Sequence, residues 1–334
     1  MYINNTVKFF ILCLAVLNCS SAKNDITEPQ EAPQETKISY RDEMRSFIGH
    51  ISVHAKSRNP NFVIIPQNGI ELVTSNGLPS GTVAMDYLNS IDANGQESLF
   101  YGDKNDNVKT SDSRIAYLLN LLNISKNAGN TILVTDYCEK DTKVDNAINL
   151  NAQNGFLPFS ADDRNLTTIP TYPEKPFLAN ADDINTLKAA KNHIFLLNYA
   201  KFESKEELFE SLSQTDYDVL IIDAFFNDGT PFSKEEVNRL KVKSNGAARM
   251  VVSYMSIGEA EDYRYYWDLN WEFEQPEWMD QENSRWKGNY KVKYWHKAWQ
   301  DLIVNSQNSY LNIILDAGFD GVYMDIVDAF EHFE

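Results

Sequence analysis

The sequence predicts an α/β fold in which eight β-strands, interleaved with helices, close into a (β/α)8 TIM barrel. Short and almost wholly apolar runs, typical of parallel strands buried on both faces, recur along the chain. Segments with helical periodicity alternate with them, which favours a parallel sheet. The chain has 334 residues and 43% hydrophobic content. This is enough for one barrel of roughly 250 residues with extensions.

The first 38 residues are expected to precede the barrel. Lys8 is followed by an apolar run, Phe9–Leu17, that is too short to cross a bilayer and indicates an export signal. The run ends near Cys19 in a way that is similar to a bacterial lipoprotein signal. We therefore expect a signal peptide over residues 1–19 and a lipid on Cys19, with ordinary secretion as the alternative. Residues 20–38 are polar and aperiodic, and are expected to form a disordered tether.

The first half of the barrel, residues 39–166, is expected to hold a leading helix and three strands. Tyr40–Lys56 places its apolar residues on one helical face, and Asn59-Pro60 ends the helix. The strands are apolar runs bounded by polar residues or glycine, and an amphipathic helix separates the last two. These elements are Phe62–Gly69, Glu97–Gly102, the helix Ser113–Lys126 and Thr131–Cys138, with Gly155–Ser160 as a candidate for an extra short strand.

The second half, residues 186–334, is expected to hold five strands after a linker over residues 167–185 that contains three prolines. Apolar runs again alternate with amphipathic segments. The expected strands are His193–Ala200, Asp218–Phe226, Met250–Ile257, Tyr290–Trp295 and Asp320–Ile326, and the expected helices are Lys205–Ser213, Ser233–Lys243 and His296–Ala317.

The last strand, Asp320–Ile326, has no helix after it in the sequence. A parallel strand needs a crossover to its neighbour. We expect the leading helix, Tyr40–Lys56, to supply this crossover, so that residues 39–334 form one circularly permuted barrel. Permutation costs little where chain ends meet at a surface. A barrel closed in a different order, or a doubly wound sheet, is the alternative.

The chain is acidic, with 48 acidic against 30 basic residues and a net charge of −18. Such a field repels nucleic acid and anionic membranes and favours neutral or cationic partners, although solubility alone would also explain it. The sequence has no glycine-rich phosphate loop and no Cys or His cluster for zinc. We expect no cofactor and no metal, and a monomer.

Three stretches, Val252–Arg264, Trp286–Trp295 and Gly318–Asp328, resemble glycoside hydrolase family 114, the endo-α-1,4-polygalactosaminidase-like proteins. The segments Tyr40–Ile51, Phe62–Gly69 and Asp136–Cys138 resemble the second half of that family's barrel, which normally follows the first. The resemblance implies a (β/α)8 barrel that acts on galactosamine-containing polysaccharide.

The chain departs from that family at two positions. Members with the activity carry an aspartate in a Trp-Leu-Asp-Ile strand and a glutamate just before the aspartate of the last motif. This chain has Tyr294 near the first position and Tyr323 at the second. It resembles the branch with Gly-Glu-Ala-Glu and Val-Tyr-Met-Asp, so the reaction cannot be carried over residue by residue.

Several expected strands end in or beside a carboxylate. Glycoside hydrolysis uses two carboxyl groups, one of which is kept protonated. We expect Asp325 to be the nucleophile or base, because it ends a rigid strand and has a counterpart throughout the family. Glu259 is the expected acid, with pairing to Arg264 as the alternative. Asp223 is the third candidate catalytic residue, with hydroxyl or amine binding, or capping of the next helix, as alternatives.

Side chains near these carboxylates are expected to bind the sugar. Amides offer both donors and acceptors to hydroxyls, and aromatic rings can stack on a sugar, although an ordinary core position would explain about half of them. The expected substrate-binding residues are Asp136, Gln67, Asn68, Tyr254, Glu261, Tyr294, Trp295, Tyr323 and Asp328. An acidic, aromatic pocket would suit a cationic amino sugar.

The sequence therefore predicts an exported glycoside hydrolase for an amino-sugar-containing polysaccharide. It would be bound to the bacterial cell envelope through its lipid alone, or secreted if Cys19 carries none. A carbohydrate-binding surface protein that has lost catalysis on the same barrel is the alternative.

Overall fold

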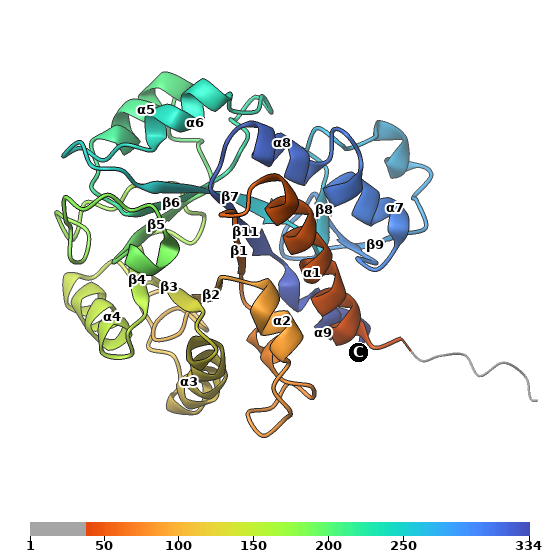
Figure 1. Cartoon of the computed structure of the whole chain (residues 1–334), viewed down its shortest axis with the longest axis horizontal. Coiled ribbons are helices and arrows are strands. Elements are labelled where there is room, and N and C mark those ends of the chain that lie inside the picture. The colour runs from red at the N-terminus through yellow and green to blue at the C-terminus, as the bar shows by residue number, and fades with distance from the viewer. Residues whose placement is uncertain (1–37) are drawn as a thin grey trace, which may run out of the picture. The chain divides into compact units, whose positions relative to one another are not determined.

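The computed structural model describes residues 38–334, and two parallel β-sheets form their centre (Figure 1). The larger sheet has the order β5-β6-β7-β11-β1, the smaller has the order β2-β3-β4, and all neighbouring strands in both are parallel. This confirms the predicted α/β fold with parallel sheets. The strands are β1 (Val63–Pro66), β2 (Ala93–Glu97), β3 (Thr131–Tyr137), β4 (Leu157–Ala161), β5 (His193–Leu196), β6 (Val219–Ile222), β7 (Met250–Ser256) and β11 (Gly321–Asp325).

The two sheets meet where β1 lies beside β2. Gln67 forms a parallel bridge with Gly95, and the N–H of Asn68 donates to the carbonyl of Gly95 at 2.9 Å. A second backbone bond joins the N–H of Asp92 to the carbonyl of Ile64 at 2.9 Å. The strands thus follow one another from β5 through β1 to β4.

Helices lie outside these strands (Figure 1). Four of them, α3, α5, α6 and α8, begin at a serine whose side chain accepts from a backbone N–H of the first turn; Ser233, for example, forms a capping box with Glu236 at the start of α6. The helices are α1 (Tyr40–Arg58), α2 (Met85–Ser90), α3 (Asp112–Asn127), α4 (Asp141–Gln153), α5 (Lys205–Ser213), α6 (Lys234–Leu240), α7 (Lys297–Gln300), α8 (Tyr310–Asp316) and α9 (Phe330–Phe333). The sequence prediction missed α2, α4 and the short α9, which follows the last strand.

Helix α1 packs beside the end of the chain. The guanidinium of Arg41 lies 2.8 Å from the carboxylate of Glu334, and the hydroxyl of Tyr294 donates to the carbonyl of Tyr40 at 2.8 Å. Strand β1, which follows α1, pairs in parallel with β11 in the register Val63↔Gly321. The first helix and the last strand are therefore neighbours, as the sequence predicted.

The expected barrel strand at Tyr290–Trp295 is wrong. Residues Asn289–Val292 form β10, which pairs antiparallel with β8 (Glu259–Glu261) and β9 (Met279–Glu282) in a small side sheet. Three of its four residues are only half-buried, whereas the parallel strands are buried on both faces. The candidate strand near Gly155–Ser160 is real, since β4 pairs with β3. Eight parallel strands result, four on each side of the linker.

The expected strand at Glu97–Gly102 is displaced. The strand is β2, Ala93–Glu97, and it is polar, with Asn94 and Gln96 buried among the parallel strands. The apolar residues after Glu97 lie in a loop instead. Glu97 therefore stands at the carboxyl end of a parallel strand, where the sequence reading had placed it at the beginning.

The expected long helix at His296–Ala317 is broken. It contains α7, a π-helical turn over Asp301–Asn305 and α8, and the side chain of Ser309 caps α8 by accepting from the N–H of Asn312. The break follows from Ser306, whose extended backbone ends the first segment.

The expected signal peptide, the lipid on Cys19 and almost all of the tether over residues 20–38 lie outside the described residues. Ser39–Glu334 form one compact unit. None of the helices between residues 38 and 334 is long and apolar enough to cross a bilayer.

Candidate functional site

A cavity of about 910 Å³ opens at the carboxyl ends of the parallel strands. Residues that end or directly follow five different strands line it: Gln67 after β1, Glu97 on β2, Tyr137 on β3, Asp223 after β6 and Asp325 on β11. In parallel α/β folds this end of the sheet carries ligands and catalytic groups. The cavity is therefore the candidate site.

Asp325 is half-buried in this cavity and takes part in no ion pair with the described residues. Its Oδ2 accepts a hydrogen bond from the hydroxyl of Tyr254 at 3.0 Å, and its Oδ1 accepts from the N–H of Ile326 at 2.8 Å. Burial raises the pKa of Asp325 well above its ordinary value, and the charges of Glu97 and Asp328 raise it further. The carboxyl keeps its proton at pH values where an exposed aspartate is ionised.

Among the carboxylates, Glu97 contributes most to the raised pKa of Asp325. Its Oε2 accepts from the amide of Asn68 at 2.9 Å, and its Oε1 accepts from the hydroxyl of Tyr137. The Oδ1 of Asn68 in turn accepts from the N–H of Glu97 at 3.1 Å. These contacts fix the orientation of the Glu97 carboxylate toward the cavity.

Two residues beside these carboxylates have a left-handed backbone. Asn68 after β1 and Ile326 after β11 both have φ of +57°. This conformation is uncommon for residues other than glycine, most of all for a β-branched residue, and such strain gathers at functional sites. Asp325 and Glu97 are thus held by segments whose backbone is bent away from ordinary strand geometry.

The other two carboxylates in the cavity share a cation. One nitrogen of Arg264 lies 2.8 Å from Asp223, and another pairs with Glu261. The hydroxyl of Tyr263 donates to Glu261 at 2.7 Å. The guanidinium is buried, and the rings within 6 Å of it are those of Phe225, Tyr254, Tyr263 and Tyr310.

This pairing separates the acidic groups into two kinds. Asp223 and Glu261 are compensated by Arg264, whereas no cation among residues 38–334 lies within ion-pairing distance of Asp325 or Glu97. Asp328 also lines the cavity, and burial, with a contribution from the charge of Glu331, raises its pKa to about 6.

Seven of the twelve side chains expected at the site line the cavity, and five do not. Those that line it are Asp325, Asp223, Gln67, Asn68, Tyr254, Glu261 and Asp328. Those that do not are Glu259, Asp136, Tyr294, Trp295 and Tyr323.

Glu259 lies in the side sheet and is fully covered. Its two carboxylate oxygens accept from the amides of Asn283 at 2.8 Å and Asn289 at 3.4 Å, and Lys291 lies 4.0 Å away. Burial raises the pKa of Glu259. Glu259, the expected acid, therefore anchors the β9–β10 hairpin and does not line the cavity. Arg264, its expected alternative partner, pairs with Glu261 instead.

Asp136 lies inside the fold beneath the loop after β2. Its Oδ1 accepts from the N–H groups of Phe100 at 2.7 Å and Tyr101 at 2.9 Å, and its Oδ2 accepts from the amide of Asn151 at 2.8 Å. All the oxygens face protein donors. Asp136 thus holds the loop that follows Glu97, and burial raises its pKa to about 6.

This burial predicts that the protein loses stability between about pH 4 and pH 6. The folded-state pKa of Asp136 lies above its ordinary value, so its contribution is fully present below about pH 4 and is lost as the pH rises through about 6. Two pKa units correspond to roughly 3 kcal/mol. The free energy of unfolding, measured by urea denaturation at pH 4.5 and pH 7, checks this.

Asp136→Asn is the matched variant, because it removes the titration and keeps the shape. The Oδ1 of Asn151 has no hydrogen-bond partner among the described residues. If the amide group of Asn151 rotates by half a turn, this oxygen can accept a hydrogen bond from the NH2 group of the new side chain. We expect a smaller difference in unfolding free energy between the two pH values than in the wild type. An unchanged difference would contradict the assignment of this pH dependence to Asp136.

The three remaining aromatic side chains belong to the core. Tyr294 donates to the carbonyl of Tyr40, and Trp295 packs 5.0 Å from the ring of Tyr40. Tyr323 packs 4.9 Å from the ring of Phe195, and its hydroxyl occupies the space that a side chain at Gly95 would need. Tyr323 and Asp325 are two residues apart and therefore point to the same face of β11; Tyr323 lies within the strand and is buried, whereas Asp325 ends the strand and lines the cavity.

Several cavity residues were not foreseen from the sequence. The sequence prediction put Glu97 at the wrong end of its strand, because β2 has no apolar run. It assigned Tyr137 to a strand but not to the site, because Asp136 beside it was the expected site residue. Trp286 was noted only as part of a motif. A left-handed turn at Asn68 and the polar strand around Glu97 were the signals that could have pointed to this region, but neither is readable as such without the fold.

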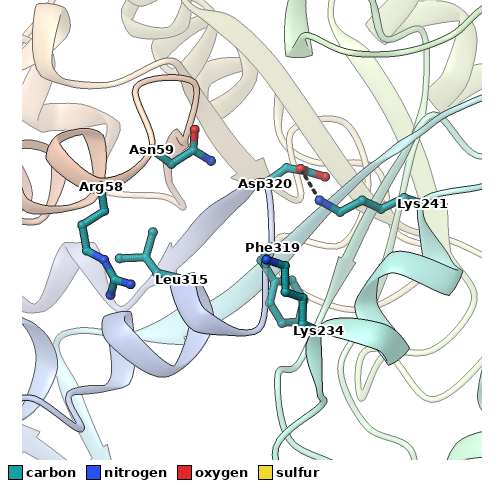
Figure 2. A pocket seen from close by; sticks show the side chains of 8 residues that line it. Arg58, Asn59, Lys234, Lys241, Leu315, Phe319 and Asp320 are labelled. Carbon is teal, nitrogen blue, oxygen red and sulfur yellow. Dashed lines mark hydrogen bonds and ion pairs between the residues drawn. The ribbon is translucent and has the colours of Figure 1, made fainter.

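A second cavity, of about 230 Å³, lies at the amino ends of the strands (Figure 2). Lys241 forms an ion pair of 2.6 Å with Asp320, whose other oxygen accepts from the N–H of Val251. Arg58 is likewise paired, with Asp316 at 2.6 Å. These two ion pairs join segments at the amino ends of the strands, and we assign no function to this cavity. Within residues 38–334, no group of three or more His, Cys, Asp or Glu side chains is arranged to hold a metal ion.

Comparison with known proteins places the second half of the chain in a family. Residues 183–334 match the model of "Glycoside-hydrolase family GH114". Asp223, Glu261, Arg264 and Asp325 lie within this match, whereas Glu97 and Asn68 lie in the half before it.

Curated relatives match over a similar portion. An uncharacterized protein of Methanocaldococcus jannaschii is 36% identical over 158 residues, which is 46% of this chain and 42% of the relative. Uncharacterized proteins of Thermotoga maritima and Deinococcus radiodurans are each 36% identical, over 36% and 34% of both partners respectively. The match thus spans less than half of each relative's length.

Proposed function

Because this chain belongs to the glycoside-hydrolase family GH114, which its residues 183–334 match, we propose that it hydrolyses glycosidic bonds with Asp325 and Glu97 as its two carboxyl groups. The observation that carries the proposal is the pair itself. A carboxyl with a strongly raised pKa and no cation shares one cavity with a second carboxylate that is fixed by hydrogen bonds. Glycosidases need this combination of a protonated and an ionised group.

In this mechanism Asp325 is the acid. The hydroxyl of Tyr254 and the N–H of Ile326 hold its carboxyl, and its proton passes to the glycosidic oxygen as the bond to the anomeric carbon breaks. Glu97 either attacks the anomeric carbon or takes a proton from the water that attacks it. The sequence predicts Asp325 as the nucleophile or base and Glu259 as the acid; the raised pKa of Asp325, and the absence of Glu259 from the cavity lining, favour the present assignment instead.

The proposed substrate is a polysaccharide that contains amino sugars. Glu97 and Asp328 leave negative charge on the cavity side chains that no cation compensates, and a protonated amine would find attraction there. Tyr263, one of the aromatic residues around Arg264, lines the cavity with 59% of its surface exposed, so a sugar ring could stack on it.

We further propose that the eight parallel strands close into a circularly permuted (β/α)8 barrel. Side chains from β4 and β5 already meet, since the rings of Phe159 and His193 lie 5.7 Å apart. Helix α1 beside β11 supports the permuted order. A lipid on Cys19 would attach this barrel to the cell envelope.

Reducing-end release from a panel of polysaccharides tests the proposal. The panel includes de-N-acetylated galactosamine and glucosamine polymers and neutral galactans, and the matched control is the full chain with both Asp325→Asn and Glu97→Gln. We expect release by the wild type and none by the double variant. Equal release by both would show that another site, or a contaminant, is responsible.

One observation favours a second candidate function, a carbohydrate-binding protein without catalysis. Tyr294 and Tyr323 occupy positions where active members of the family are expected to carry carboxylates, and both are buried core residues here. No release from any polymer, together with glycan binding that survives the double substitution, would support this candidate over the hydrolase.

A further inference from the structure

The tip of the β9–β10 hairpin, Asn283–Gly288, borders the mouth of the large cavity. Three consecutive residues of this tip line the cavity: Arg285, Trp286 and Lys287. All three are exposed, and Trp286 leaves 51% of its surface uncovered. An exposed tryptophan beside a cavity has no packing reason of its own, since a core would bury it.

The hairpin tip is held in one conformation by the fold. Buried Glu259 accepts from the amides of Asn283 and Asn289, which stand at the two ends of the tip. Within the tip, the N–H of Arg285 donates to Asn283 Oδ1 at 3.0 Å, and the N–H of Asn289 donates to the carbonyl of Trp286 at 3.1 Å. A preformed loop loses little entropy when a ligand binds.

The charge of the hairpin tip is opposite to that of the chain. Arg285 and Lys287 take part in no ion pair with any described residue, although the chain as a whole carries −18. Asp262 and Glu282 contact Gly288 and do not line the cavity; the charge of Lys287 acts on Asp262, but the two form no ion pair. Two cations that face a cavity without partners are available to a ligand.

In the loops of residues 102–106 and 164–166, which also line the cavity, the charges balance one another. Asp103 and Lys104 are adjacent in the loop after β2 and both line the cavity, and Arg164 is paired with Asp106 at 2.8 Å. Among the described residues, the positive charge of the cavity lining that has no ion-pair partner is therefore concentrated on the hairpin tip, whereas the negative charge without such a partner is on Glu97 and Asp328.

We propose that the hairpin tip is a subsite for a sugar residue that carries a negative charge, as a carboxylate or a sulfate. The ring of Trp286 would stack on the sugar, the planar fork of Arg285 suits two oxygens of the anionic group, and Lys287 adds a second charge. The inference rests on the proposed function in that the same cavity takes a glycan. Together, the acidic carboxylates and the basic tip fit a polysaccharide that contains both amino sugars and acidic sugars.

Binding measurements on the full chain with Asp325→Asn, which cannot consume its ligand, test the subsite. The probes are polygalacturonate for the carboxylate, dextran sulfate for the sulfate and dextran as the neutral reference. We expect Kd for one anionic probe to rise about tenfold or more in the double variant Arg285→Gln with Lys287→Gln, and about tenfold in Trp286→Ala, with dextran unaffected by the charge variant. Which anionic probe responds identifies the acidic group.

A matched control changes the same number of charges elsewhere. Lys175→Gln with Lys188→Gln alters two exposed lysines outside the cavity. If this control weakens binding of the anionic probes as much as the tip variant does, or if the tip variant binds them like the wild type, the subsite is overturned. Glu259→Ala, which frees the tip without changing its charges, is expected to weaken the same binding, and circular dichroism confirms that each variant is folded.

Failure of the subsite and failure of the hydrolase give different results. Hydrolysis by the wild type, with anionic binding that ignores the tip variants, overturns the subsite alone. Absence of hydrolysis, with anionic binding that the tip variants weaken, overturns the hydrolase and supports the subsite.

Discussion

Asp325→Asn is expected to lower kcat for glycan hydrolysis by about 10²–10⁴-fold, the usual contribution of a positioned general acid. Asparagine keeps the size of the side chain, its oxygen can still accept from the N–H of Ile326 and its NH2 group can donate to the hydroxyl of Tyr254, but it has no acidic proton to give. KM should change little, because the shape of the cavity is kept. Initial rates of reducing-end release over a range of substrate concentrations measure both constants.

The pH dependence of the wild type should follow from the same carboxyl. Since burial and Glu97 raise the pKa of Asp325, activity that needs its proton is present below that pKa and falls as the pH rises through it. The falling limb of kcat against pH should disappear in Asp325→Asn. Asp316→Asn is the matched control, because it makes the same change in an exposed residue at the other end of the strands. Loss of activity in the control, or full activity in Asp325→Asn, would contradict the role of Asp325.

Arg264→Met is expected to lower the free energy of unfolding by about 3–5 kcal/mol, the usual cost of leaving buried charges without their partner. The methionine fills much of the space but leaves Asp223 and Glu261 buried without their cation. It also removes the charge that the four surrounding aromatic rings contact. Urea denaturation followed by tryptophan fluorescence measures the change.

The control for this variant is an arginine whose pair is exposed. Arg239 lies 2.6 Å from Glu206 on the surface, with about half of each side chain in contact with solvent. Exposed pairs contribute about 0–1 kcal/mol, so Arg239→Met should have little effect. Similar losses in the two variants would mean that the buried triad is no more important to stability than a surface pair.

The fold could be predicted from the sequence to a large extent, because the apolar composition of most of the parallel strands indicates that they are buried. Met250–Ser256 and Val219–Ile222 are uniformly apolar or small, and the prediction placed the start of each within one residue, although the second ends four residues earlier than predicted. Helix α5 was found with its bounds. The prediction failed where residue type does not indicate the place of a strand in the fold: β2 is a buried parallel strand of polar residues, and β10, in which polar and apolar residues alternate, is a half-buried strand of the antiparallel side sheet.

The candidate site was predictable only in part. A carboxylate at the end of an apolar strand indicates a position at the carboxyl edge of a sheet, and this rule located Asp325 and Asp223. It failed for Asp136, which also ends such a run, because the loop after β2 folds over it and uses both its oxygens. Whether a strand-end carboxylate faces a cavity depends on which loop covers it.

By itself the sequence determined the class of fold, the neighbourhood of the first helix and the last strand, and the family to which the second half belongs. The class of fold follows from local periodicity, which indicates which residues are buried. The family follows from long motifs that the chain shares with its relatives. Only the tertiary structure decided that Glu97 and Asp325 line one cavity, that Arg264 neutralises Asp223 and Glu261, and that Glu259 anchors a hairpin. Each of these is a contact between segments far apart in the chain, and the charge state of a carboxyl is set by such neighbours and by burial rather than by its place in the sequence.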